Sequence, residues 1–350
     1  MSQKNVIGYL LLCLTAWLPV SCSTIDDDLS DCDTDSGYDY DLRYEMRLVT
    51  NISTELTTQL SATAAEQKVA DALRQHLRNV FSDQAHDVNL SFYDTTGDSV
   101  RQHQQEDIID ESQKVYTLNL PMQEYMHLAV ANVVDNALVG LRGDDYCHPA
   151  QLAQVSGETV DSHSTGIFTA RQPMHVLEGV DQTFDVRLYM ANCAAAIVID
   201  TTGVQVSGIA VETTGFADGF SICDSVYHFS AGTPASIRAH HVAVDDSKLA
   251  CYCSVNFPSR EVMRTVIETT DPFVSVGTAE GLWQYKVYVT MPDGSVTETL
   301  LDMNEPLRAG QLRVLTARLG DDGSVWVDDT TVGVSVTLNW NDGGQHEVPL

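Results

Sequence analysis

The sequence predicts a mainly β protein made of two β-sandwich domains, with one amphipathic helix in the N-terminal domain. Segments rich in β-branched and aromatic residues recur along most of the chain, which is typical of strands. Short polar turns such as Thr96-Gly97-Asp98 and Pro292-Asp293-Gly294 separate these segments. Helical periodicity is clear in a single stretch. Many short strands with polar turns and few helices favour sandwiches over alternating α/β folds.

The first 21 residues have the features of a signal peptide. Lys4 precedes an apolar run, Val6–Leu18, which is too short to span a bilayer as a helix. The run ends in Val20-Ser21-Cys22, similar to the lipobox of bacterial lipoproteins, whose cysteine is acylated (with chains such as palmitate) and begins the mature chain. An ordinary signal with an incidental cysteine is the alternative, because Pro19 replaces the usual leucine.

Residues 22–37 read as an acidic tether. Aspartates crowd this segment, cannot bury apolar surface and repel one another, so we expect it to stay extended and solvated. The tether would hold a folded body away from the membrane to which Cys22 is attached. It also resembles the acidic signals that follow the lipidated cysteine in surface-exposed lipoproteins of some Gram-negative bacteria, and it predicts an outer-membrane location facing the exterior.

The helix is expected around residues 63–81. Its apolar side chains recur at helical spacing and form one stripe, made of Ala65, Val69, Leu73, Leu77, Val80 and Phe81. About 310 residues follow the tether, which suggests two domains of ordinary size. The acidic pause at Leu177–Gln182 is the preferred boundary, giving an N-terminal domain over 38–181 and a C-terminal domain over 182–350.

No catalytic motif stands out, and we expect neither enzymatic activity nor a cofactor. The chain has no Gly-rich phosphate loop, HExxH, GxSxG or CxxC motif. Its formal net charge is −30, which excludes nucleic acid as an expected partner, because phosphate backbones would repel it. Eight cysteines are present, two of them at Cys13 and Cys22, and the remaining six show no spacing that fixes disulfide pairing.

One weak metal candidate lies around residues 240–253. If Asp245–Lys248 forms a hairpin loop, His240 pairs with Cys253 and Val242 pairs with Cys251. His240, Cys251 and Cys253 would then share one face of the sheet as possible zinc ligands. Val242 shares that face as well, so burial of the two thiols in a sandwich core is the favoured interpretation.

The C-terminal stretch Val332–Trp340 alternates perfectly. Every second residue is apolar and the residues between them are small or polar, which predicts a strand with one apolar face. The apolar set is Val332, Val334, Val336, Leu338 and Trp340. Such a strand either completes its own domain or is donated to another subunit, whose pockets its alternate side chains would fill.

Several stretches together resemble one family, the FimB-type minor fimbrial anchor subunits, which are fimbrillin-associated lipoproteins of type V pili. The resemblance covers nearly the whole mature chain. Besides Cys22 and the acidic tether, it is carried by ADALRQHLRNVF, HDVNLSFYD, GIFTARQPM, YKVYVTMPDGSVTETLL, PLRAGQLRVL and VGVSVTLNW. The family implies two transthyretin-like β-sandwich domains, no catalysis, and attachment of the pilus to the outer membrane with a limit on its length.

The resemblance also implies a direction of assembly. Shaft subunits of this type lose a lipidated N-terminal strand to an arginine-specific protease, and the groove so opened takes a neighbour's strand. An anchor keeps its lipid and its N-terminal strand, so it can only donate, and Val332–Trp340 is the expected donor to a shaft subunit. Arg43 and Arg47 lie beside the first strand and leave open whether it is cleaved.

A surface lipoprotein that binds glycans is the alternative function. Such proteins usually present flat aromatic side chains to the sugar. The mature chain has only Trp283, Trp326 and Trp340, and Trp340 continues the alternating strand, so we expect it to pack inward. This scarcity of tryptophan weakens the glycan hypothesis but does not remove it.

Overall fold

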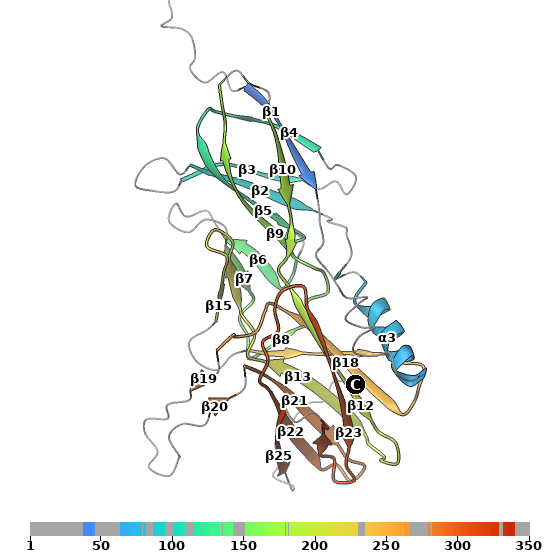
Figure 1. The fold of residues 1–350 in the computed structure, drawn as a ribbon. Helices are drawn as coiled ribbons and strands as arrows, with labels where there is room; N and C mark the ends of the chain where they lie inside the picture. The colour runs from blue at the N-terminus through green and yellow to red at the C-terminus, as the bar shows by residue number, and fades with distance from the viewer. Residues whose placement is uncertain are drawn as a thin grey trace, which may run out of the picture. The chain divides into compact units, whose positions relative to one another are not determined.

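A computed structural model describes most of the chain between residues 38 and 339. The described residues are 38–45, 64–78, 80–81, 87–94, 101–108, 115–134, 136–142, 151–178, 180, 182–229, 235–262, 264–265, 279–280, 282–328 and 332–339. They form a mainly β structure of packed sheets with the helix α3 (Ala64–His76), as the composition predicted (Figure 1). Among these residues no helix is long and apolar enough to cross a membrane.

The first sandwich joins a three-stranded sheet, in the order β10-β1-β4, to a five-stranded sheet, in the order β11-β9-β5-β2-β3. The strands are β1 (Tyr38–Glu45), β2 (Val88–Asp94), β3 (Arg101–Ile108), β4 (Val115–Leu120), β5 (Glu124–Ala131), β9 (Phe168–His175), β10 (Thr183–Arg187) and β11 (Tyr189–Met190). Leu120 and Val186 of the small sheet pack against Leu90, Phe92 and Tyr125 of the large one, and all are nearly inaccessible. Burying such side chains is the main favourable term holding the two sheets together.

A third sheet covers the other face of the five-stranded one. It has four strands in the order β15-β14-β7-β6, namely β6 (Val139–Arg142), β7 (Gln151–Gln154), β14 (Gly219–Ser221) and β15 (Val226–His228). Its Leu152 and Phe220 share a buried cluster with Leu128 and Val130 of β5. Both faces of β5 are therefore buried, which explains its almost continuous apolar sequence.

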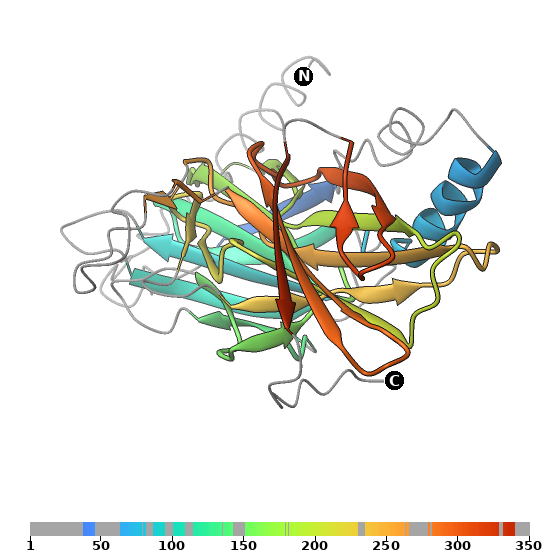
Figure 2. The ribbon, with the colours of Figure 1, turned by 90° about the horizontal axis from the view of Figure 1, so that it is seen from below.

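The second sandwich packs a five-stranded sheet, β17-β18-β12-β23-β24, on a six-stranded sheet, β25-β22-β21-β13-β16-β8 (Figure 2). Its strands are β8 (Thr159–Asp161), β12 (Cys193–Asp200), β13 (Gly208–Thr214), β16 (Ser236–Arg238), β17 (His240–Val242), β18 (Leu249–Asn256), β21 (Trp283–Thr290), β22 (Val296–Met303), β23 (Leu312–Leu319), β24 (Val325–Trp326) and β25 (Val332–Asn339). A separate pair joins β19 (Arg264–Thr265) to β20 (Ala279–Glu280). With one apolar core between the two sheets of each sandwich, the chain has the tandem β-sandwich fold class that the sequence predicts.

Helix α3 packs on the outer face of the five-stranded sheet of the second sandwich. The prediction that it belongs to the N-terminal domain is therefore wrong. Its predicted stripe is confirmed, since Val69, Leu73 and Leu77 are almost fully buried. They share a cluster with Ala196 and Cys253 of that sheet. The chain therefore leaves the first sandwich after β1, crosses to cover the second, and returns as β2. A Cβ at Gly166 would clash with the carbonyl oxygen of Val80, so the segment after α3 passes close to the start of β9.

Strand pairing links segments from both sides of the predicted boundary at 181/182. β8 pairs with β16, β7 pairs with β14, and β10 pairs with β1. Each sandwich therefore contains strands from both of the predicted segments, 38–181 and 182–350. The domain bounds themselves stay a prediction.

Candidate functional site

The candidate donor strand β25 lies at an edge of the six-stranded sheet. It pairs antiparallel with β22 from Val332 opposite Met303 to Asn339 opposite Val296. In the described part of the chain β22 is its only neighbour. The predicted strand at this position is thus present, and one of its backbone edges faces away from the sheet.

The register places the apolar positions of β25 on one face. Val332, Val334, Val336 and Leu338 lie opposite Met303, Leu301, Thr299 and Thr297, respectively. Those four side chains of β22 are at most 3% exposed. Directly opposite residues share a face of a sheet. The alternate positions of the candidate donor therefore belong to the inward face of the sandwich. Trp340 and Cys22 lie outside the described residues.

The first strand, β1, has the opposite position in its sheet. It pairs in parallel with β10 from Asp41 opposite Thr183 to Glu45 opposite Arg187. It also pairs antiparallel with β4, from Tyr38 opposite Leu120 to Arg43 opposite Val115. The backbone of Arg43 is therefore flanked on both sides, by Val115 and by Asp185. The place for a strand between β4 and β10 is filled by the chain's own N-terminal strand, whereas Arg47 lies outside the described residues.

The hairpin predicted around the metal candidate is confirmed in register. His240 lies opposite Cys253, and Val242 lies opposite Cys251. Both thiols are fully buried against α3, and burial raises the pKa of Cys251 to about 12, so it stays protonated. Within the described ranges no group of three His, Cys, Asp or Glu side chains is arranged to hold a metal. The surroundings of the two thiols fit a packed core.

A buried polar joint, which sequence reasoning missed, connects the segments before β9, before β12 and before β23. The Asn192 side chain accepts a hydrogen bond from the Ile167 amide (2.6 Å) and donates one to His163 Nδ1 (2.8 Å). The backbone carbonyl oxygen of Asn192 accepts a bond from the Gly310 amide (2.7 Å). The only advance signal was Asn192 itself, a lone polar residue inside an otherwise apolar run.

Two buried histidines have environments unsuited to proton transfer with solvent. His127 stacks on Phe92, and its Nδ1 lies 3.1 Å from the Ser91 carbonyl oxygen. Burial lowers the pKa of His127 and of His163 to about 4. Both rings are therefore neutral at physiological pH, and both are at most 2% exposed.

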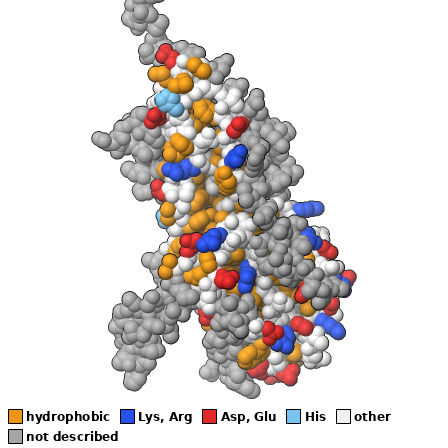
Figure 3. All heavy atoms as spheres, viewed as in Figure 1, with side chains coloured by type: hydrophobic (Ala, Val, Ile, Leu, Met, Phe, Trp, Pro, Cys, Tyr) orange, Lys and Arg blue, Asp and Glu red, His pale blue; other side chains and the backbone are white. Residues whose placement is uncertain are grey.

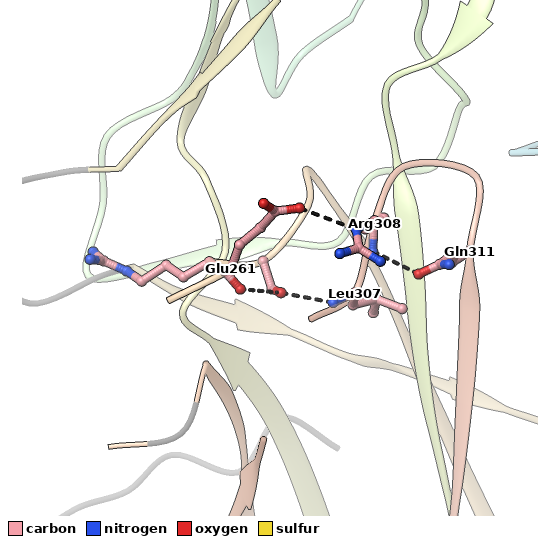
Figure 4. A network of polar contacts seen from close by, with 6 residues as sticks. Glu261, Leu307, Arg308 and Gln311 are labelled. Carbon is pink, nitrogen blue, oxygen red and sulfur yellow. Dashed lines mark hydrogen bonds and ion pairs between the residues drawn. The ribbon is translucent and has the colours of Figure 1, made fainter. Parts of the chain in front are cut away.

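An exposed polar network joins two loops of the second sandwich. Figure 4 shows Arg308 between Glu261 and Gln311, with Arg308 Nε donating to Glu261 Oε1 (3.1 Å) and the Arg308 amide donating to Gln311 Oε1 (3.0 Å). Beside it the Leu307 amide donates to Ser259 Oγ (2.9 Å). The Arg308 and Glu261 side chains are more than half exposed, so this pair contributes little stability and orients the loops.

The two described tryptophans have different environments. Trp283 is 1% exposed and its indole N–H donates to the Glu305 carbonyl oxygen (2.9 Å). Trp326, on β24, is 53% exposed. Trp326 is therefore the one described tryptophan whose ring is open to a ligand.

On the face drawn in Figure 3, Lys and Arg side chains lie interspersed with Asp and Glu side chains.

Comparison with known proteins gives matches in structure alone. No protein-family model matches the chain, and no curated protein matches it. A candidate adhesin from Bacteroides ovatus has a TM-score of 0.48 at 10% identity, over 88% of this chain and 96% of its own. The fimbrial anchor protein Mfa2 from Porphyromonas gingivalis has a TM-score of 0.43 at 10% identity, over 85% and 98%. A candidate polysaccharide-binding protein from Bacteroides thetaiotaomicron has a TM-score of 0.45 at 9% identity, over 84% and 97%. At these values the matches carry no functional conclusion for this chain.

Proposed function

We propose that the chain is a non-enzymatic anchor subunit of a fimbria, held in the outer membrane by lipid on Cys22. In this proposal the strand Val332–Trp340 is donated to the first shaft subunit, and because the anchor accepts no strand in return, it limits the length of the pilus at the cell surface. The partners are a shaft subunit and the membrane, with no cofactor.

One observation carries the proposal: the first strand is flanked on both sides and the last strand on one. With β1 between β4 and β10, the first sandwich offers no open place to a neighbour's strand there. β25 is the outermost strand of its sheet in the described part of the chain. An edge strand leaves a sheet, or gains a neighbour, at the cost of one ladder at most. A subunit built this way is suited to giving its last strand, and it has no vacant place between β4 and β10 for a neighbour's strand.

The lipid half of the proposal is tested by changing Cys22 to alanine. Acyl chains contribute about 0.8 kcal/mol per buried CH₂ to membrane binding, and the acidic tether adds no attraction to anionic lipid. We expect Cys22→Ala to move the protein and its pili from the outer membrane to the medium. Mass spectrometry of the extracted wild-type N-terminus should show a lipidated Cys22 followed by an intact β1. A mature chain that begins after Arg43 or Arg47 would contradict the anchor role.

The donation half is tested with a matched pair of variants. Val336 lies opposite Thr299, which is fully buried, whereas Thr337 lies opposite the half-buried Glu298 on the other face. In a shaft groove Val336→Asp would bury an unpaired charge, which costs several kcal/mol, about 2–7 for a polar group alone. Thr337→Asp should have a smaller effect.

Two readouts are needed, namely the melting temperature of the purified monomer and capture of the shaft subunit. Normal melting with lost capture by Val336→Asp supports donation. Loss of folding in the monomer would show that β25 serves only its own core, and the donor would then have to lie elsewhere, with residues 344–350 as the next candidate. If Val336→Asp captures the shaft subunit as well as Thr337→Asp does, donation by this strand is refuted.

A further inference from the structure

Four side chains form a row across the five-stranded sheet of the second sandwich. Trp326 of β24 lies opposite Arg318 of β23, Arg318 lies opposite Asp200 of β12, and Asp200 lies opposite Leu249 of β18. Residues directly opposite one another point to the same face, and neighbouring strands lie about 4.8 Å apart, so the row is about 14 Å long. We call it the Trp326 row.

The Trp326 row lies on the face that α3 covers, at the end that the helix leaves accessible. Ala196 and Val198, earlier on β12, share their cluster with Val69 and Leu73 of the helix. Toward β23 and β24 the same face becomes exposed. The Arg318 side chain is 65% exposed and Trp326 is 53% exposed. A flat accessible strip therefore borders the docked helix.

The Trp326 ring is held in place by a tight turn. Its Nε1 donates to Ser324 Oγ (2.6 Å), and that hydroxyl donates to Asp322 Oδ1 (2.5 Å). Gly323 has a φ of +80°, which favours glycine, and the Gly320 amide closes the turn on the Ser324 carbonyl oxygen (2.8 Å). Because its N–H is already bonded, what the indole exposes is mainly its apolar ring. An aromatic ring fixed before binding loses little conformational entropy when a ligand stacks on it.

Ionised groups stand directly beside the ring. Arg318 Nη2 donates to Asp328 Oδ1 at 2.5 Å. On the other side of Arg318, hydrogen bonds from Thr202 and the charges of Lys248 and Arg318 lower the pKa of Asp200, so this carboxylate stays ionised at neutral pH. The row thus offers guanidinium donors and carboxylate acceptors within one or two strand spacings of an exposed aromatic ring.

We propose that the Trp326 row is a binding site for a neutral oligosaccharide. A sugar ring presents a C–H face that stacks on an aromatic ring and hydroxyls that pair with Arg and Asp, which is the combination found here. An acidic glycan is disfavoured by the net charge of −30. A protein hot spot is disfavoured because it requires apolar contacts that shield it from water, and the exposed neighbours Thr316 and Asp328 are polar. This site goes beyond the anchor role and does not depend on it.

The test uses the full-length protein, purified in a detergent without a sugar headgroup. Binding is measured first on an array that carries neutral hexose and pentose oligosaccharides beside uronic-acid oligosaccharides, and then by calorimetry with the neutral oligosaccharide that gives the strongest signal. We expect wild-type protein to bind a neutral oligosaccharide and Trp326→Ala to weaken that binding about tenfold or more. Arg318→Gln, which removes the guanidinium, should weaken it by a smaller factor.

Tyr189→Ala is the matched control, because Tyr189 is also an exposed aromatic on a strand, with 51% of its surface accessible. It should bind as the wild type does, and all variants should melt like the wild type. The proposal is overturned by four outcomes: no neutral oligosaccharide binds, uronic-acid oligosaccharides bind as well as neutral ones, Trp326→Ala leaves binding unchanged, or Tyr189→Ala weakens it equally. Loss of shaft capture by Trp326→Ala without loss of sugar binding would assign the row to a protein partner instead.

Discussion

The first and last described strands are both eight residues long, yet they occupy opposite positions in their sheets. β1 lies between two strands, one parallel and one antiparallel, while β25 has β22 on one side. An interior strand satisfies two ladders, so removing it leaves two rows of unpaired backbone groups, whereas removing an edge strand leaves one. Length and composition thus say less about a strand's role than the number of neighbours it keeps.

Removing β1 should have the largest effect. Deleting residues 23–45 would separate β4 from β10 and uncover the core around Leu120 and Val186, both of which are fully buried. We expect the free energy of unfolding to fall by more than about 4 kcal/mol, measured by denaturant titration. Deleting only residues 23–37 is the control and should leave stability unchanged. Equal stability of the two deletions would mean that β1 is not an interior strand.

The Asn192 joint should come next. Asn192→Ala leaves the buried Ile167 amide and His163 Nδ1 without their partner. Each unsatisfied buried group costs about 1–3 kcal/mol, so the two together should lower the free energy of unfolding by at least about 2 kcal/mol, measured by thermal or denaturant unfolding. Gln205→Ala, at an exposed position, serves as the control and should change stability by less than about 0.5 kcal/mol. A biphasic transition in Asn192→Ala would show that the joint makes the two sandwiches, and hence the two end strands, unfold together.

Acid should weaken the fold through its two buried histidines. The folded-state pKa of His127 and of His163 is about 4, below the ordinary value of 6.5. Between these two values the unfolded chain binds more protons, so stability falls as pH drops from 6.5 to 4, by about 1.4 kcal/mol per pH unit for each ring. Below pH 4 this contribution becomes constant.

The variants His127→Gln and His163→Gln separate the two contributions. Each should remove about half of the pH dependence between 6.5 and 4, measured as the denaturant midpoint across that range. The His127 variant measures the contribution of the sandwich that contains β1, and the His163 variant measures the contribution of the Asn192 joint. A slope unchanged in both variants would assign the acid sensitivity to other groups.

The smallest effect is expected at the exposed loop network. Arg308→Ala removes an ion pair with Glu261 in which both side chains are more than half exposed. Such pairs contribute about 0–1 kcal/mol, so the melting temperature should move by no more than a few degrees. A larger shift would mean that the loop before β23 supports the sandwich of β25 more strongly than its exposure suggests.

Sequence patterns predicted single elements well and their partners poorly. The alternation over Val332–Trp340 predicted β25, the stripe through Leu73 predicted α3, and a hairpin hypothesis gave the correct pairing of His240 with Cys253. Periodicity identifies which face of an element is apolar, but it does not say which sheet will cover that face. The docking of α3 on the second sandwich therefore had no signal in the sequence. Neither did the exposure of Trp326, because a tryptophan in a short strand packs inward or outward depending on its neighbours.

The central position of β1 also determines how the molecule resists a pull. A force applied to residue 38 along the strand axis would load the ladders to β4 and to β10 in shear, so that all their hydrogen bonds share the load at once. A force that pulls an edge strand such as β25 sideways, away from β22, would instead break its hydrogen bonds one after another. Shared loading requires many bonds to fail together, so β1 is better suited than β25 to withstand tension.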